Sequence, residues 1–144
     1  MAKMMLVGKT NAGKTSLIQM LNEERLYYKK TQAAEYYENF LDLPGEYLEN
    51  PRYYNAIISM SFDVDIIALV HSVDSNMCVF PPNFGDMFNV KVIGIVTKVD
   101  LASDLNHLNQ VREYLLEAGS KEIYEVSAVT KEGVDAIKNL IWNQ

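Results

Sequence analysis

Short aliphatic runs of strand length alternate with amphipathic stretches along the chain. Residues 3–7 form an apolar run that stops at a glycine, and residues 63–74 (DVDIIALVHSVD) and 90–100 (VKVIGIVTKVD) are aliphatic runs that end in polar residues. Such runs are typical of buried parallel strands, and residues 123–126 form a shorter one. Strands that alternate with helices predict an open sheet covered on both faces, with its ligand at the carboxyl ends of the strands.

Helical periodicity fills most of the intervals between these runs. One predicted helix has a cap residue, Ser103 or Asp104, at its start and Gly119 at its end. Residues 33–45 (AAEYYENFLDLPG) are too few for a helix and a strand, so they predict a tight hairpin. The predicted fold is α/β, with a mostly parallel six-stranded sheet. The predicted helices are Lys14–Leu21, Pro51–Met60, residues 103–119 and Val134–Trp142.

Composition narrows the class of protein. With 144 residues, 49% of them hydrophobic and 22% charged, we expect a single soluble domain spanning residues 1–144. No apolar run approaches the ~18 residues of a membrane span, and since the first predicted strand begins at residue 3 we expect no targeting segment. Cys78 is the only cysteine, which favours the cytoplasm. The net charge of −6 argues against a nucleic-acid partner.

The first chemical motif lies between the first strand and the first helix. Gly8, Gly13, Lys14 and Thr15 match the phosphate-loop pattern G-x-x-x-x-G-K-[ST] in the context that this pattern requires. Its backbone N–H groups would face phosphate oxygens, Lys14 would reach the β- and γ-phosphates, and Thr15 would bind Mg²⁺. The alternative is a glycine-rich turn before a helix. The correct flanking elements favour the phosphate loop.

Two later segments indicate which nucleotide base the chain would bind. Thr97, Lys98 and Asp100 form T-K-x-D, one letter from the N-K-x-D of guanine-nucleotide-binding proteins. Asp100 would accept hydrogen bonds from the ring N–H and the amino group of guanine, a pair of donors that adenine lacks. Residues 127–129 (Ser-Ala-Val) resemble the S-A-x element whose backbone N–H contacts the guanine oxygen. A surface turn is the alternative for T-K-x-D alone, but the three segments together favour guanine.

Between these motifs, residues 42–45 (DLPG) form D-x-x-G. Asp42 would hold Mg²⁺ through a water, and the Gly45 N–H would contact the γ-phosphate. Hydrolysis would remove this contact and so couple the state of the nucleotide to the segment that follows Gly45. Thr31 is the candidate for the threonine that senses the γ-phosphate and Mg²⁺ from the first switch; a solvated loop threonine is the alternative.

Taken in this order, the motifs resemble those of a small Ras-like GTPase across essentially the whole chain. The stretches TQAAEYY, DLPGEYLENPRYYNAI, DVDIIALVHSVDS and TKVD are similar to the EutP/PduV family, whose members are encoded with bacterial microcompartments for ethanolamine and propanediol utilisation. The resemblance implies a P-loop fold, Mg²⁺ and a bacterial cytoplasmic protein, with a shell or pathway protein as partner. The nucleotide-binding residues it implies are Gly8, Asn11, Ala12, Gly13, Lys14, Thr15, Ser16, Gly45, Thr97, Lys98, Asp100, Ser127, Ala128 and Val129.

The sequence departs from the Ras-like pattern at several points. Glu46 stands where Ras-like enzymes often have a water-orienting glutamine, so we expect slow hydrolysis with Lys14, Thr15, Thr31 and Glu46 as the catalytic set. The alternative for Glu46 is a surface role. Only 11 positions separate Thr31 from Asp42, which predicts a shortened first switch. Residues 75–89 are too few for a full third helix.

Asn11 occupies the place at which potassium-activated GTPases carry asparagine. A K⁺ ion there would neutralise charge that builds up between the β- and γ-phosphates. The alternative is that asparagine is present because it tolerates the left-handed backbone conformation.

Three functions remain open. The first is a GTP-binding switch with slow hydrolysis. The second is an ATP-using phosphotransferase that acts on a small carboxylate such as acetate, and an adenine requirement fits Asp100 poorly. The third is a scaffold that binds nucleotide without turnover. We rank them in that order.

Overall fold

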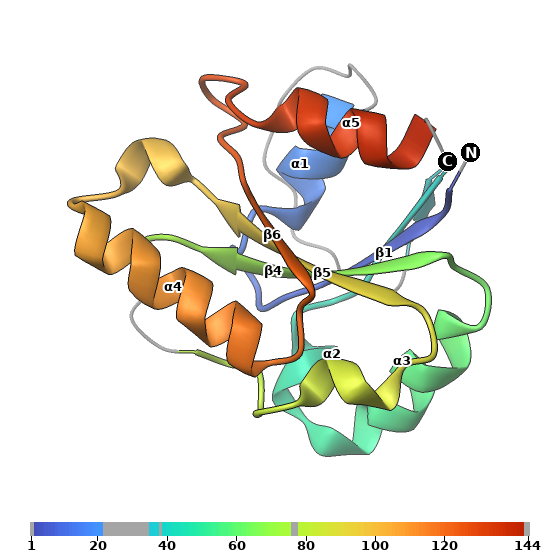
Figure 1. Cartoon of the computed structure of the whole chain (residues 1–144). Coiled ribbons are helices and arrows are strands. Elements are labelled where there is room, and N and C mark those ends of the chain that lie inside the picture. Colours follow the sequence, from blue (N-terminus) through green and yellow to red (C-terminus); the bar gives the residue numbers. More distant parts are fainter. Residues whose placement is uncertain (1, 22–34, 38, 76–77, 143–144) are drawn as a thin grey trace.

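The computed structural model describes residues 2–21, 35–37, 39–75 and 78–142 (Figure 1). At its centre lies a six-stranded sheet with the strand order β2-β3-β1-β4-β5-β6. The strands β3, β1, β4, β5 and β6 run parallel, and the edge strand β2 pairs antiparallel with β3. The predicted hairpin and mostly parallel sheet are therefore confirmed. The strands are β1 (Met4–Val7), β2 (Glu35–Tyr37), β3 (Phe40–Asp42), β4 (Ile66–Ser72), β5 (Lys91–Thr97) and β6 (Glu122–Glu125).

Helices cover both faces of this sheet (Figure 1). The helices α1 and α5 lie on one face, and α3 and α4 lie on the other. The bounds of α1 and α5 are those predicted from the sequence. Within the described residues, no helix is both long enough and apolar enough to cross a membrane. The α-helices are α1 (Lys14–Leu21), α2 (Glu46–Glu49), α3 (Tyr54–Ser61), α4 (Leu105–Glu117) and α5 (Val134–Trp142), and the 3₁₀ helices are η1 (Pro51–Tyr53), η2 (Phe84–Met87) and η3 (Val99–Leu101).

The prediction of one helix over Pro51–Met60 is wrong in part. The segment begins as the 3₁₀ helix η1 and becomes α-helical only at Tyr54, and the unpredicted turn α2 precedes it. Asn50 separates the two helices in an extended conformation, with φ −124° and ψ 114°. Proline disfavours helical geometry in the residue before it, so Pro51 divides the segment at Asn50.

Side chains of the central strands alternate between two hydrophobic clusters. Met4 belongs to the cluster that contains Leu17 of α1 and Ile137 of α5, whereas Met5 belongs to the cluster that contains Val111 of α4. Each of these side chains is fully buried, which contributes about 1.5–3 kcal/mol per large aliphatic residue. The sheet is thereby fixed on both faces, and its carboxyl edge is the place where the polar loops meet.

Local signals set the ends of α4. Asp104 caps its first turn, with its carboxylate accepting a hydrogen bond from the His107 N–H at 2.7 Å. Gly119 follows the last turn with φ +104°, a conformation that favours glycine. Both features agree with the sequence prediction. Between β4 and β5, the residues that the structure describes (73–75 and 78–90) contain one helical segment, the short helix η2. This agrees with the expectation that no full helix fits there.

Candidate functional site

The phosphate-loop motif joins β1 to α1 and curls around a lysine side chain. The ammonium of Lys14 donates hydrogen bonds to the carbonyl oxygens of Gly8, at 2.8 Å, and Lys9, at 3.3 Å. Gly13 has φ +92° and Asn11 has φ +70°, so two left-handed residues turn the backbone within three positions. At Gly8, an added Cβ would lie 2.5 Å from the Val70 carbonyl oxygen. The loop therefore requires a glycine at this position because the chains approach so closely.

Burial gives Lys14 an unusual electrostatic setting. Its side chain is 6% exposed, and desolvation lowers its pKa below the ordinary value of 10.5. The negative charges of Asp42 and Glu49 act in the opposite direction and raise this pKa. A buried ammonium gains most from a strongly negative neighbour, so the loop is suited to a phosphate group.

Two oxygen ligands meet beside this lysine. Thr15 is the second residue of α1, and its hydroxyl donates a hydrogen bond to the Asp42 carboxylate at 2.7 Å. Asp42 is fully buried at the end of β3, where it pairs in register with Leu6 of β1. A hydroxyl and a carboxylate are oxygen donors of the kind that Mg²⁺ prefers, and few protein ligands are needed where phosphates complete the coordination. The residues present therefore fit a magnesium ion.

The D-x-x-G segment packs directly against the phosphate loop. A Cβ added at Gly45 would lie 2.2 Å from the Thr10 nitrogen and 2.8 Å from the Lys9 carbonyl carbon. Gly45 has an ordinary right-handed conformation, so close approach and not φ explains the glycine. Glu46 follows as the first residue of α2, with an exposed side chain.

The two segments expected to recognise the base lie on the other side of Lys14. They border a cavity of about 330 Å³, hereafter the base cavity. Asp100 accepts a hydrogen bond from the Ser127 hydroxyl at 2.7 Å, so that the T-K-x-D and S-A-V segments are joined. The base cavity is lined by Gly13, Ser16, Leu17, Thr97, Lys98, Asp100, Leu101, Val126, Ala128 and Val129.

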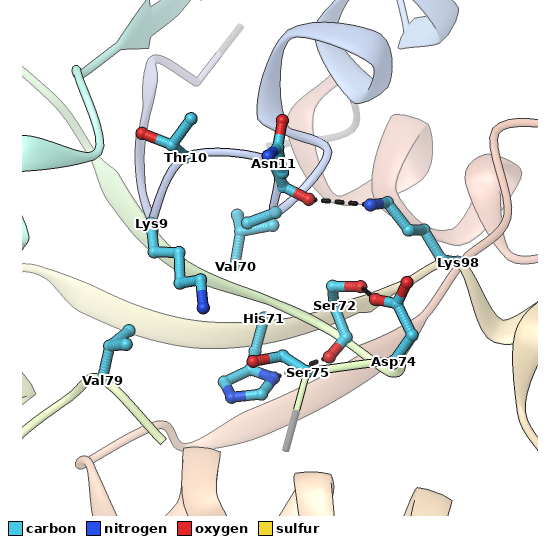
Figure 2. A pocket seen from close by; sticks show the side chains of 11 residues that line it. Lys9, Thr10, Asn11, Val70, His71, Ser72, Asp74, Ser75, Val79 and Lys98 are labelled. Atoms are coloured by element: carbon cyan, nitrogen blue, oxygen red, sulfur yellow. Dashed lines mark hydrogen bonds between the residues drawn. The ribbon is translucent and has the colours of Figure 1, made fainter. Parts of the chain in front are cut away.

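Residues at the end of β5 tie this cavity to the phosphate loop. The Lys98 ammonium donates a hydrogen bond to the Asn11 carbonyl oxygen at 2.8 Å (Figure 2), and the Thr97 hydroxyl donates one to the Ala12 carbonyl oxygen. These contacts span 87 and 85 positions of the sequence. The threonine in place of the asparagine of N-K-x-D thus has a structural role in supporting the loop.

The structure brings together nearly all of the residues predicted for the site. The loop residues, Asp42, Gly45 and the segments of the base cavity share the carboxyl edge of the sheet. Thr31 lies outside the described residues, and with it most of the first switch. The backbone of Asn11 is left-handed, which agrees with the conformational explanation for this residue.

Sequence reasoning missed Glu49. The sequence drew attention to Glu46 because of its place after the glycine, yet Glu49 is the glutamate whose charge acts on Lys14. Helical spacing could have found it: Glu49 is four residues after Gly45, and residues i and i+4 lie on the same face of a helical turn. Since Gly45 faces the phosphate loop, that face is directed to the loop as well.

The chain is similar to members of one known protein family. The PduV-EutP family profile, described as "Ethanolamine utilisation - propanediol utilisation", matches residues 1–143. The chain is 42% identical over 135 residues to the propanediol utilization protein PduV of Citrobacter freundii, covering 94% of this chain and 89% of that protein. It is 30% identical over 140 residues to the probable acetate kinase EutP of Escherichia coli (strain K12), covering 95% and 87%.

A solved structure supports the fold class. The structure of Methanosarcina barkeri Roco2 RocCORdC bound to GDP is similar with a TM-score of 0.60 and 19% sequence identity. The match covers 96% of this chain and 47% of that one, so this chain spans about half of its length. The predicted α/β fold, a mostly parallel sheet covered by helices on both faces, is thus confirmed.

Proposed function

The chain belongs to the PduV-EutP family of ethanolamine and propanediol utilisation, and on this premise we propose that it binds guanine nucleotide and hydrolyses GTP slowly as a switch or accessory factor of that metabolism. One observation carries the proposal. A phosphate loop that encloses the buried Lys14 and a carboxylate-bordered cavity of about 330 Å³ lie side by side, joined by the Lys98 hydrogen bond to Asn11. Phosphates and base would each find a complementary surface.

The base is chosen by Asp100. Its carboxylate offers acceptors and no donor, and the hydrogen bond from Ser127 fixes its position at the cavity. Guanine presents two adjacent N–H donors to such a group, whereas adenine would leave the carboxylate unpaired at a cost of about 1–3 kcal/mol. The backbone of residues 127–129 would contact the guanine oxygen, and the stem of Lys98 would lie along the base.

The phosphate chain would lie over the N-terminus of α1. Backbone N–H groups of residues 11–16 would bind phosphate oxygens, and the Lys14 ammonium would exchange the carbonyl oxygens of Gly8 and Lys9 for phosphate. Thr15 and Asp42, with Thr31 from the first switch, would hold Mg²⁺, which supplies charge neutralisation at the phosphates. The Gly45 N–H would contact the γ-phosphate, which would couple the presence of this phosphate to the position of α2.

Slow turnover follows from the residues near the γ-phosphate position. Glu46 replaces the glutamine that orients water in Ras-like enzymes, and its negative charge opposes the approach of a triphosphate. If Asn11 holds K⁺ in the GTP-bound form, hydrolysis is faster in potassium than in sodium. The partner in this proposal is a shell or pathway protein of a cytoplasmic bacterial microcompartment, and the whole chain acts as one domain.

The test is nucleotide binding and phosphate release by the purified protein. We expect fluorescent GDP to bind in the presence of Mg²⁺ with ADP a poor competitor, and slow release of phosphate from GTP that is lost in Lys14→Ala. A matched control is Lys121→Ala, because Lys121 is exposed and directly precedes β6, at the end of that strand away from the phosphate loop. Equal competition by ADP, or binding that survives Lys14→Ala, would contradict the proposal.

A second candidate is transfer of phosphate to a small carboxylate. It is favoured by the similarity to two proteins named probable acetate kinase EutP, at 30% and 31% identity over most of the chain. The same assay separates the candidates. Nucleotide consumption that requires acetate and yields an acyl phosphate identifies the phosphotransferase, while release of inorganic phosphate from GTP without acetate identifies the GTPase. Retention of nucleotide without either product identifies the non-hydrolysing scaffold.

A further inference from the structure

A second cavity, of about 410 Å³, borders residues 9–12 of the phosphate loop, and its lining differs from that of the base cavity (Figure 2). Of the described lining residues, the two cavities have only Lys98 in common: the base cavity is lined by Gly13 of the loop and by Ser16 and Leu17 of α1, whereas this one is lined by residues 9–12 of the loop. Its walls are residues 9–12 of the loop, residues 70–72 at the carboxyl end of β4, and Asp74, Ser75 and Val79 beyond it, with Lys98 at the rim. We call it the rear cavity.

The side chain of Lys9 points into the rear cavity (Figure 2). Its ammonium is partly buried and, among the residues that the structure describes, it makes no hydrogen bond or ion pair. The two neighbouring lysines differ, because the Lys14 and Lys98 ammonium groups are bonded to loop carbonyl oxygens. An ammonium that lines a cavity without a counter-ion can donate hydrogen bonds to an anion bound there.

The other walls define the kind of anion. Lys9 and Lys98 bring two positive charges, and the one negative charge, Asp74, already accepts a hydrogen bond from the Ser72 hydroxyl. The lining is therefore net positive. Val70, Val79 and Ala12 add apolar surface, which leaves room for the short alkyl group of a carboxylate.

We propose that the rear cavity binds a small oxyanion, a carboxylate or a phosphate, through the Lys9 ammonium beside residues 9–12 of the phosphate loop. The proposal does not depend on nucleotide binding, although the cavity shares Asn11, Ala12 and Lys98 with the proposed nucleotide site. Lys9 and Asn11 belong to the phosphate loop itself, and Lys98 borders both cavities. An anion in the rear cavity would add negative charge near the phosphate site, so the two ligands oppose each other. We expect GDP affinity to fall about two- to fourfold at saturating anion.

The experiment follows backbone amide chemical shifts of the nucleotide-free protein at constant ionic strength. Sodium chloride is exchanged stepwise for sodium acetate in one series and for sodium phosphate in another. We expect saturable shifts at residues 9–11 and 71–75 in the wild type. These shifts should be lost in Lys9→Met and kept in the matched control Lys3→Met. Lys3 is exposed and precedes β1, whereas Lys9 follows that strand. Saturation at lower concentration by acetate than by phosphate assigns the site to a carboxylate, and the reverse order assigns it to phosphate.

Phosphate can also occupy the nucleotide loop, and residue-specific shifts separate the two sites. Shifts confined to residues 13–16 that persist in Lys9→Met would overturn the proposal, as would the lack of saturation with either anion. If Lys9→Met does not fold, Val79→Asp provides the second variant, because it places a negative charge in the rear cavity without altering the loop. Anion shifts that survive Val79→Asp would likewise overturn the proposal. These readouts need no nucleotide, so a failure here is distinct from a failure of the proposed function.

Discussion

At the scale of single residues, Asp100 makes the most specific prediction about the base. An Asp100→Asn substitution converts one acceptor oxygen into an N–H donor, which repels the donors of guanine and suits xanthine, whose ring carries an oxygen in place of the amino group. We expect GDP affinity to fall at least about tenfold and XDP affinity to rise by a similar factor. Titration with fluorescent analogues of both nucleotides measures this. Unchanged GDP binding would show that Asp100 does not contact the base.

The burial of Lys14 leads to a prediction about how the stability of the protein depends on pH. Burial lowers its pKa below 10.5, and the charges of Asp42 and Glu49 offset only part of this effect. Between the lowered pKa and 10.5 the unfolded chain binds the Lys14 proton more tightly than the folded chain does, so the free energy of unfolding rises with pH across that window. We expect the nucleotide-free wild type to gain stability relative to Lys14→Met as the pH is raised through it.

Urea unfolding of both proteins, from about pH 8 to about pH 11, measures this difference and cancels the other titrating groups. A difference that stays constant with pH would contradict the electrostatic account. Repeating the series in Glu49→Gln tests the neighbour: without its charge the pKa of Lys14 falls further, so the window widens toward lower pH. Glu46→Gln, in the same helical turn, is the matched control and should leave the window unchanged.

At the scale of elements, the short turn α2 is held by tertiary contact. Leu48 is buried in the core, the Tyr47 ring stacks on the Tyr53 ring at 4.8 Å, and Gly45 lies against the phosphate loop. A methyl group at position 45 would collide with the backbone of Thr10, which cannot move aside as a flexible side chain can. The contact therefore couples the turn to the loop.

We expect Gly45→Ala to destabilise the protein by about 1–3 kcal/mol and to weaken nucleotide binding as well, because the loop itself must shift. Glu46→Ala, an exposed substitution in the next position, should change stability by no more than about 0.5 kcal/mol. Denaturant unfolding and GDP titration of the two variants check both statements. A fully stable Gly45→Ala protein would mean that the turn can separate from the loop at little cost.

The same turn shows where sequence reasoning succeeds and fails for elements. The bounds of α1 and α5 follow from the sequence because helical apolar spacing persists over their full length. The turn α2 has only four residues, and its existence depends on Leu48 and Gly45 meeting distant segments. Local pattern cannot foresee such contacts. Pro51 did carry the signal for the break at Asn50, through the restriction that proline imposes on the preceding residue.

At the scale of the whole molecule, the carboxyl edge of the sheet was predictable and its fine structure was not. Alternation of strands and helices places residues 8–16, 42–45, 97–100 and 127–129 on one edge whatever their exact contacts. The support that Thr97 gives to Ala12, the effect of Glu49 on Lys14 and the exposure of Lys9 to the rear cavity depend on side-chain positions more than on pattern. The sequence therefore predicts where the site lies better than it predicts which contacts each residue of the site makes.

Because the proposed nucleotide site is built from these four segments, it exists only in the folded chain, and its ligand should stabilise the whole molecule. At a concentration about 100 times its Kd, a ligand of the folded state adds about 2.7 kcal/mol. For a chain of 144 residues this corresponds to a rise in Tm of roughly 10 °C. Thermal melting with GDP and Mg²⁺ measures the rise, with ADP as the base control and Lys14→Ala as the loop control. An equal rise with ADP would contradict the choice of guanine by Asp100, whereas no rise with either nucleotide would contradict nucleotide binding itself.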